Sequence, residues 1–284
     1  MATRQPDFQL FSSLRFDVLL LESTANSAQS TSPSPFYMLP YHRDRMLEAA
    51  AHFGWLVAAE RIRGPEGLQH LLTQLEAAID IKSSTPLRVR TVLHYDGNIT
   101  VETNLIPAVP LANLYPARIP PPAPKLEVSP LTGGAMMLGE GDSIQSGITH
   151  GNPIYTQPWT VVVDPEKTAP SHFTTYKTTY RDMYTTARAR AGIKSMTEPK
   201  EVLIISDTSS EIMEGSLTSV FFWRGERWVT PPVSSGGQAG TTRRWLLENG
   251  LCEEEAVSSI SLVDGEECWI SNGVRGLIRG RVKL

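Results

Sequence analysis

One lysine lies in a segment that is suited to covalent chemistry, the run SHFTTYKTTYRDMY at residues 171–184. Lys177 has hydroxyl and aromatic neighbours there, and it precedes a helical pattern that ends at Gly192 and places on one face Tyr180, Tyr184, Ala187 and Ala191. A lysine that is partly removed from water loses proton affinity, so its amine can form a Schiff base with an aldehyde. An isolated lysine at a helix start is more often a solvated surface residue, so companions elsewhere in the chain must decide between these interpretations.

Two later segments carry groups that could hold a charged aromatic ligand. In GTTR, Gly240 precedes Thr241 and Thr242 at the predicted start of a helix, where free backbone N–H groups favour a phosphate. A plain helix cap would use the same residue types. Glu214 precedes a tight turn in MEGSLTS, and a buried carboxylate there would need a cationic partner such as a protonated pyridine nitrogen. A solvated turn glutamate is the alternative.

An arginine near the N-terminus could also reach an anion. The run HRDRMLEAAAHFGW begins an amphipathic helix, because Met46, Ala49, Ala50 and Phe53 fall on one face. Arg45 lies near the start of this predicted helix.

The rest of the N-terminal region predicts an α+β unit. Alternation from Phe8 to Leu21 predicts strands, and the following run STANSAQSTSPSPF predicts a polar loop. A second helix has a buried stripe that consists of Leu68, Leu71, Leu72, Leu75 and Ile79. The runs LRVRTVLHY and ITVETNLI predict a hairpin, and Asp96 and Gly97 between them suit a two-residue turn.

The C-terminal region predicts further strands around the lysine and glutamate segments. These strands are WTVVVD, EVLIISD, LTSVFFW, RWVT and ECWISN, and the helix TTRRWLLENG ends at Gly250. Between the two regions, proline-rich and then glycine-rich sequence predicts irregular structure. We therefore expect an N-terminal α+β domain at 1–118, a linker with an irregular insertion at 119–157, and a C-terminal ligand-binding domain at 158–284.

Composition restricts the class of partner. The chain has 284 residues, of which 40% are hydrophobic, and a formal net charge of -4, so charge gives no case for nucleic acid or an anionic membrane. Cys252 and Cys268 are too few for a disulfide framework. No signal peptide or transmembrane run is evident, so we expect a cytoplasmic protein with a small-molecule partner.

Taken together, these segments resemble the fold-type IV pyridoxal-phosphate enzymes, which include branched-chain and D-amino acid aminotransferases and 4-amino-4-deoxychorismate lyases. HRDRM is similar to the family's H-x-x-R-L segment, MEGSLTSVFF to E-G-x-x-x-N, and TPP with GTTR to the phosphate turn T-P-P…G-I-T-R. The resemblance implies a two-domain fold of mixed α+β and α/β type, with pyridoxal 5'-phosphate between the domains, and commonly a homodimer.

The resemblance also implies roles for individual residues. Lys177 would form the Schiff base and act catalytically, and Glu214 would bind the pyridine nitrogen. The phosphate would be bound by Arg45, Gly240, Thr241 and Thr242.

Two positions depart from the family pattern. Ser219 replaces a usual asparagine, and Asp182 replaces a tyrosine that commonly meets the ring hydroxyl, so another residue must do that job. Arg181, four residues after Lys177, resembles the K-x-x-x-R arrangement of the lyases, and KTTYRDMYTTAR is similar to their fungal members. This detail favours a lyase over a transaminase.

The predicted reaction is the conversion of 4-amino-4-deoxychorismate to 4-aminobenzoate and pyruvate, a step in folate precursor synthesis. Arg181 and Arg275 are candidate partners for the substrate carboxylates, and Arg15, Arg88 and Arg90 are weaker candidates. An aminotransferase for branched-chain or D-amino acids or amines remains an alternative, as does a non-catalytic descendant of the fold.

Overall fold

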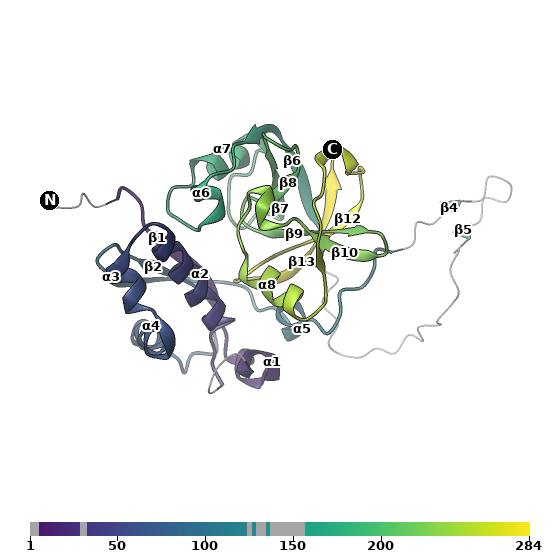
Figure 1. Ribbon diagram of the computed structural model, residues 1–284. Helices are drawn as coiled ribbons and strands as arrows, with labels where there is room; N and C mark the ends of the chain where they lie inside the picture. Colours follow the sequence, from purple (N-terminus) through teal and green to yellow (C-terminus); the bar gives the residue numbers. More distant parts are fainter. Residues whose placement is uncertain (1–5, 29–32, 124–126, 129–134, 137–156) are drawn as a thin grey trace.

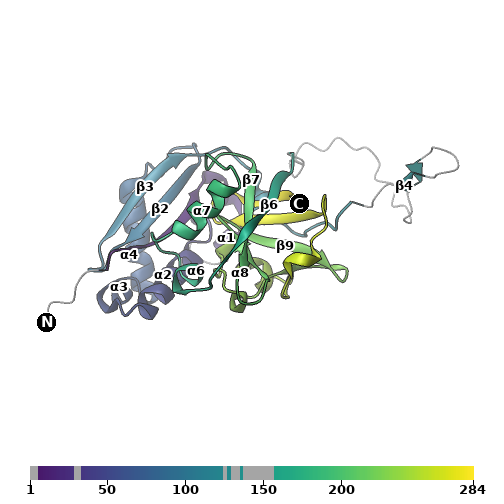
Figure 2. The same cartoon turned by 90° about the horizontal axis from the view of Figure 1, so that it is seen from above.

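The computed structural model describes residues 6–28, 33–123, 127–128, 135–136 and 157–284. Figures 1 and 2 show an N-terminal part, coloured purple to blue, beside a C-terminal part, coloured teal to yellow.

A small antiparallel sheet and a layer of helices form the N-terminal part. The strand order is β1-β2-β3, and side chains from both layers, such as Leu14, Met46, Trp55 and Leu71, form the core between them. The strands are β1 (Leu10–Phe16), β2 (Leu87–Leu93) and β3 (Ile99–Leu105). The helices are α1 (Thr24–Ser27), α2 (Leu39–His52), α3 (Leu56–Arg61) and α4 (Gly64–Ala78), with a 3₁₀ turn at Val18–Glu22.

Local capping explains where this part differs from the sequence prediction. Val18–Glu22 is a 3₁₀ turn and not a strand, because the Asp17 side chain accepts from the backbone N of Leu19 at 3.1 Å and starts a helical turn. Ser23 caps α1 in the same way, where we expected only a loop. The hairpin is confirmed, but its turn has three residues, because the backbone N of His94 donates to the carbonyl of Asn98.

A large mixed sheet dominates the C-terminal part. Its order is β11-β10-β9-β12-β13-β6-β7-β8, in which β6 runs parallel to both β7 and β13. The first four strands in the chain are β6 (Trp159–Thr168), β7 (Lys200–Ser206), β8 (Ile212–Gly215) and β9 (Ser219–Arg224). The others are β10 (Arg227–Thr230), β11 (Glu253–Glu254), β12 (Glu267–Asn272) and β13 (Gly276–Lys283).

Three helices accompany the sheet. They are α6 (His172–Thr175), α7 (Asp182–Arg190) and α8 (Thr241–Glu248). Helix α7 lies against β6 and β7, whereas α8 lies against β12. The buried face of α7 presents Tyr184 and Ala187, as predicted, whereas Tyr180 precedes the helix and is 48% exposed. Short 3₁₀ turns lie at Val233–Ser235 and Ser259–Ser261.

The predicted linker and insertion, 119–157, falls mostly outside the described residues, as does most of the glycine-rich run 133–152. Before it lies α5 (Leu111–Leu114), and within it the short strands β4 (Glu127–Val128) and β5 (Ala135–Met136) pair with each other. The domain boundaries and the homodimer therefore stay predictions. Among the described helices, none combines the length and apolar character needed to cross a membrane.

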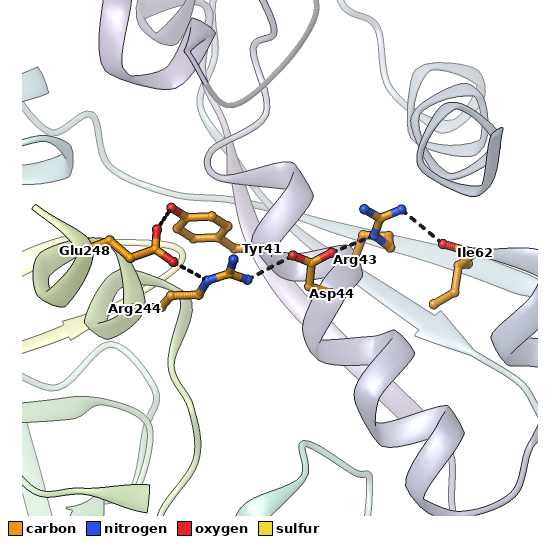
Figure 3. A network of polar contacts seen from close by, with 6 residues as sticks. All are labelled: Tyr41, Arg43, Asp44, Ile62, Arg244 and Glu248. Atoms are coloured by element: carbon orange, nitrogen blue, oxygen red, sulfur yellow. Dashed lines mark hydrogen bonds and ion pairs between the residues drawn. The ribbon is translucent and has the colours of Figure 1, made fainter. Parts of the chain in front are cut away.

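A polar network joins α2 of the N-terminal part to α8 of the C-terminal part (Figure 3). Arg244 donates to Asp44 at 2.9 Å and to Glu248 at 2.8 Å, and the Tyr41 hydroxyl donates to Glu248. Because Arg45 lies on α2 and Thr241 begins α8, this network holds together two helices that carry predicted phosphate-binding residues.

Candidate active site

A cavity of about 350 Å³ lies where the two parts meet, and this volume is in the range of small-ligand sites. The structure brings to its lining every residue to which the resemblance gives a role, together with the two leading candidates for the substrate carboxylates. They are Arg45, Lys177, Arg181, Glu214, Gly240, Thr241, Thr242 and Arg275.

Lys177 lies in the extended connection between α6 and α7, where β1 holds its backbone. The backbone N of Phe11 donates to the carbonyl of Lys177 at 3.2 Å, and the N of Thr179 donates to the carbonyl of Gln9 at 2.8 Å. The ammonium nitrogen lies 3.5 Å from Oε1 of Gln238. Burial, together with the positive charges of Arg181 and Arg45, holds the pKa of Lys177 well below its usual range. A deprotonated amine of this kind can act as a nucleophile or a base.

Glu214 lies on β8 and is only 7% exposed. Burial raises its pKa to about 7, and this rise is opposed by the hydrogen bond from Tyr184 and by the positive charge of Lys177. The Nε2 amide of Gln238 donates to the Tyr184 hydroxyl at 3.3 Å, which in turn donates to Glu214. A carboxylate that titrates near neutrality is suited to a cationic ring nitrogen, because a nearby positive charge would stabilise its ionised form.

The N-terminus of α8 forms an anion cup. Gly240 precedes the helix, and among the described residues no side chain caps it, so the first backbone N–H groups of α8 are left for a ligand. The Thr242 hydroxyl lies 2.7 Å from the Ser271 hydroxyl, and both line the cavity. A Cβ atom at Gly240 would lie 2.3 Å from Oγ of Ser219, so a larger residue here would require the Ser219 side chain to move.

Arg45 reaches the same cavity from α2. Its Nη2 donates to the Ser12 hydroxyl at 2.5 Å, whereas its Nε is buried without a hydrogen-bond partner among the described residues. Burial lowers the pKa of Arg45 to about 10. A buried donor without a partner is costly, and an anionic ligand would remove that cost.

The donor set fits pyridoxal phosphate. A buried amine, a carboxylate for the ring nitrogen, and a helix N-terminus beside an arginine with an unpaired N–H donor supply the three contacts that an aldehyde-bearing pyridine phosphate requires. Among the described residues, no cluster of three or more His, Cys, Asp or Glu side chains could hold a metal ion.

Four more arginines are among the residues that line the cavity, Arg88, Arg90, Arg181 and Arg275. Arg90 is neutralised by Glu102, with Nη1 at 2.8 Å from the carboxylate. Arg181 donates to the backbone carbonyl of Ser216 at 2.7 Å, and Arg275 donates to the carbonyl of Met196 at 2.7 Å. Among the described residues, Arg88 donates a single long bond of 3.4 Å, to Ser13. Together with Glu102, these four arginines therefore carry a net positive charge.

The weaker candidate Arg15 lies elsewhere. It is 1% exposed and forms an ion pair with Asp17 at 2.7 Å, outside the cavity lining.

Three residues that contribute to the site were not identified from the sequence. Tyr184 was predicted only to lie on one face of the helix after Lys177, because its bond to Glu214 depends on a contact between distant segments. Gln238 lies in a stretch between Pro232 and Gly240 that has no recognisable pattern. Glu201 lies in a hydrophobic strand, and its charge within the run EVLIIS was the one available signal.

Comparison with known proteins agrees with this geometry. Residues 144–281 match the model of the amino-transferase class IV family. The aminodeoxychorismate lyase of Saccharomyces cerevisiae is 38% identical over 139 residues, which are 44% of this chain and 37% of that protein. The match thus spans little more than a third of that relative's length. A proposed aminodeoxychorismate lyase of Schizosaccharomyces pombe is 23% identical over 249 residues, covering 86% of this chain and 83% of that protein.

A solved structure shows the same fold over nearly the whole chain. A proposed amino-acid aminotransferase from Mesorhizobium loti superposes with a TM-score of 0.64 at 23% identity, covering 97% of this chain and 100% of that one. The predicted fold class and the resemblance to fold-type IV enzymes are thereby confirmed. The roles of the individual site residues stay predictions.

Proposed function

Because the chain has the fold-type IV architecture and its residues 144–281 match the class IV aminotransferase model, we propose that it is a pyridoxal-phosphate-dependent 4-amino-4-deoxychorismate lyase. The proposed reaction releases 4-aminobenzoate and pyruvate. When bound, pyridoxal phosphate would supply a carbonyl that condenses with the substrate amine and a ring that withdraws electrons from the adjacent carbon.

Lys177 is the proposed catalytic base. Burial and the neighbouring positive charges lower its pKa, which favours the neutral amine, and a neutral amine can take the proton from the substrate carbon that bears nitrogen. The same group can then donate that proton to the departing enol of pyruvate. Aromatisation of the remaining ring makes this elimination favourable, and no second substrate is needed.

Glu214 and the anion cup have binding roles. Glu214 would accept a hydrogen bond from the protonated ring nitrogen and so keep the ring electron-withdrawing, while Tyr184 fixes the carboxylate. Arg45 and the N-terminus of α8 would bind the phosphate.

We choose this substrate because several arginines line the cavity. Arg88, Arg181 and Arg275 have no carboxylate partner within 4 Å among the described residues, and only Arg90 is neutralised. 4-Amino-4-deoxychorismate carries two carboxylates, and their charges would be matched by such a surface. A branched-chain amino acid has one carboxylate and an apolar side chain, so it would leave several cations in the cavity without an anion.

The test is to mix the purified, cofactor-loaded protein with 4-amino-4-deoxychorismate and follow the fluorescence of 4-aminobenzoate, with and without a keto acid. The proposal expects equal product in both reactions. Product that forms only with the keto acid would select the aminotransferase alternative. The similar structure from Mesorhizobium loti is that of a proposed amino-acid aminotransferase. Cofactor binding without turnover of any amine would select a non-catalytic protein.

A further inference from the structure

A second buried carboxylate, Glu201, lies behind the wall of the cavity at the start of β7. It is 0% exposed, and it forms no ion pair with a Lys, Arg or His side chain within 4 Å among the described residues. Burial of a carboxylate costs free energy unless hydrogen bonds satisfy its oxygens. The hydrogen-bond partners of Glu201 therefore indicate its role.

Five donors converge on this carboxylate, and four of them come from the turn between β8 and β9. Oε1 accepts from the N and Oγ of Ser216, at 3.0 and 2.6 Å, and from the N of Val202 at 2.9 Å. Oε2 accepts from the N of Leu217 at 3.2 Å and from Oγ1 of Thr218 at 2.8 Å. Both oxygens act only as acceptors, which is the pattern of an ionised carboxylate.

The opposite face of the same turn holds Arg181. Its Nη2 donates to the carbonyl of Ser216 at 2.7 Å, and the guanidinium lies 4.3 Å from the centre of the Tyr184 ring. Arg188 donates to Oγ of Ser216 at 3.3 Å, so the Ser216 hydroxyl connects Arg188 to Glu201. Ser216 therefore donates to Glu201 through its backbone N and its hydroxyl, and its carbonyl accepts from Arg181.

Close packing makes this arrangement specific. A Cβ atom at Gly215 would lie 2.4 Å from Oγ1 of Thr218 and 2.9 Å from Cγ of Glu201, so the turn lies directly on the Glu201 side chain. Ser216, Leu217 and Thr218 all line the cavity, and the carboxylate that fixes them does not.

We propose that Glu201 is a positioning residue, which fixes Arg181 at the substrate side of the cavity by holding the 216–218 turn. This inference rests on the proposed function, because it assigns Arg181 to a substrate carboxylate. Glu201 itself touches neither substrate nor cofactor. Its effect is to present the Ser216 carbonyl, which fixes one nitrogen of the guanidinium and leaves its other donors for an anion.

The test combines Glu201→Gln with Arg181→Met in a double-mutant cycle. The glutamine amide would direct N–H groups at donors of the turn, so we expect the KM for 4-amino-4-deoxychorismate to rise about tenfold, with a smaller change in kcat. In the Arg181→Met background, Glu201→Gln should change KM by less than about twofold. Additive effects, or an unchanged KM in folded Glu201→Gln, would overturn the inference.

Asp164→Asn is the matched control. Asp164 is also a buried carboxylate of this sheet, but its partner is Arg190 at 2.6 Å, away from the cavity. This variant should lose thermal stability and keep its KM. If Glu201→Gln does not fold, Thr218→Val removes a single bond to Oε2, and the same cycle applies with a rise of about twofold to threefold.

Amide hydrogen exchange separates this inference from the proposed function. Even if the wild type releases no 4-aminobenzoate, the amide of Leu217 should exchange faster in Glu201→Gln, because it donates to Oε2 of Glu201. The amide of Ser216 also donates to the carbonyl of Val202 at 2.9 Å, so it serves as the internal reference. Unchanged protection of the Leu217 amide would show that Glu201 does not hold the turn, whatever substrate the enzyme uses.

Discussion

The Tyr184 hydroxyl donates a hydrogen bond to the Glu214 carboxylate, although α7 and β8 carry these residues on separate segments of the C-terminal part. The bond stabilises the ionised carboxylate against burial, which otherwise raises its pKa. Glu214 must be ionised to hold a protonated ring nitrogen. By favouring the ionised carboxylate, Tyr184 strengthens the proposed contact between Glu214 and the cofactor.

Replacing Tyr184 with phenylalanine should therefore weaken cofactor binding. Loss of one hydrogen bond to a charged group raises the pKa of Glu214 further and should raise the Kd of pyridoxal phosphate about tenfold. The loss of cofactor affinity should be larger at pH 6 than at pH 8, because at pH 6 a larger fraction of the Glu214 carboxyl is protonated. Absorbance titration at both pH values measures this. Tyr180→Phe, at a side chain that is 48% exposed, is the control, and equal affinity in both variants would contradict the role of Tyr184.

Lys177→Ala should abolish the covalent attachment of the cofactor. We expect the visible absorbance band of the loaded protein to disappear, borohydride to trap no cofactor on the chain, and activity to fall by about a thousandfold or more. Mass spectrometry of the reduced protein locates the adduct. Lys167→Ala serves as the control, since Lys167 lies on β6 and bonds Ser210. An adduct that persists in Lys177→Ala would refute the assignment.

Arg45→Met should separate phosphate recognition from ring recognition. The unpartnered Nε indicates a contact to the phosphate, so the Kd of pyridoxal phosphate should rise about tenfold to a hundredfold. The affinity for pyridoxal, which lacks the phosphate, should change by less than about twofold. Arg43→Met is the matched control on the same helix, because Arg43 bonds Asp44 and lies outside the cavity lining. Equal losses of affinity for pyridoxal phosphate and for pyridoxal would show that Arg45 does not contact the phosphate.

In the cofactor-free protein, the contribution of Glu214 to stability should fall as the pH rises from about 4.5 to 7. Burial raises the pKa of Glu214 from 4.5 to about 7, so in this window the native state keeps a proton that the unfolded state releases. The Glu214 contribution is therefore fully present below pH 4.5 and is lost as the pH rises through 7. Urea unfolding of wild type and Glu214→Gln across this range measures the difference. Parallel stability curves would contradict the raised pKa.

Local sequence determined much of the secondary structure. The buried stripe of α2, the alternation in β1 and the strand runs of the C-terminal part all appear where periodicity placed them, because burial on one face imposes a period of about 3.6 or 2 residues. Element ends were less predictable. At Asp17 and Ser23, single capping hydrogen bonds start short helical turns, and such turns are too short to be predicted from hydrophobic periodicity.

The sequence by itself also determined which residue types could bind an aldehyde, a ring nitrogen and a phosphate, since motifs in a fixed order carry that information. Only the tertiary structure decided how they act together. Lys177 faces Glu214 and Arg45 because β1 pairs with the lysine segment and α2 packs against α8, and such contacts join residues far apart in the chain. Tyr184, Gln238 and Glu201 acquire their contacts in the same way. Their chemistry depends on burial and partners, and folding alone supplies both.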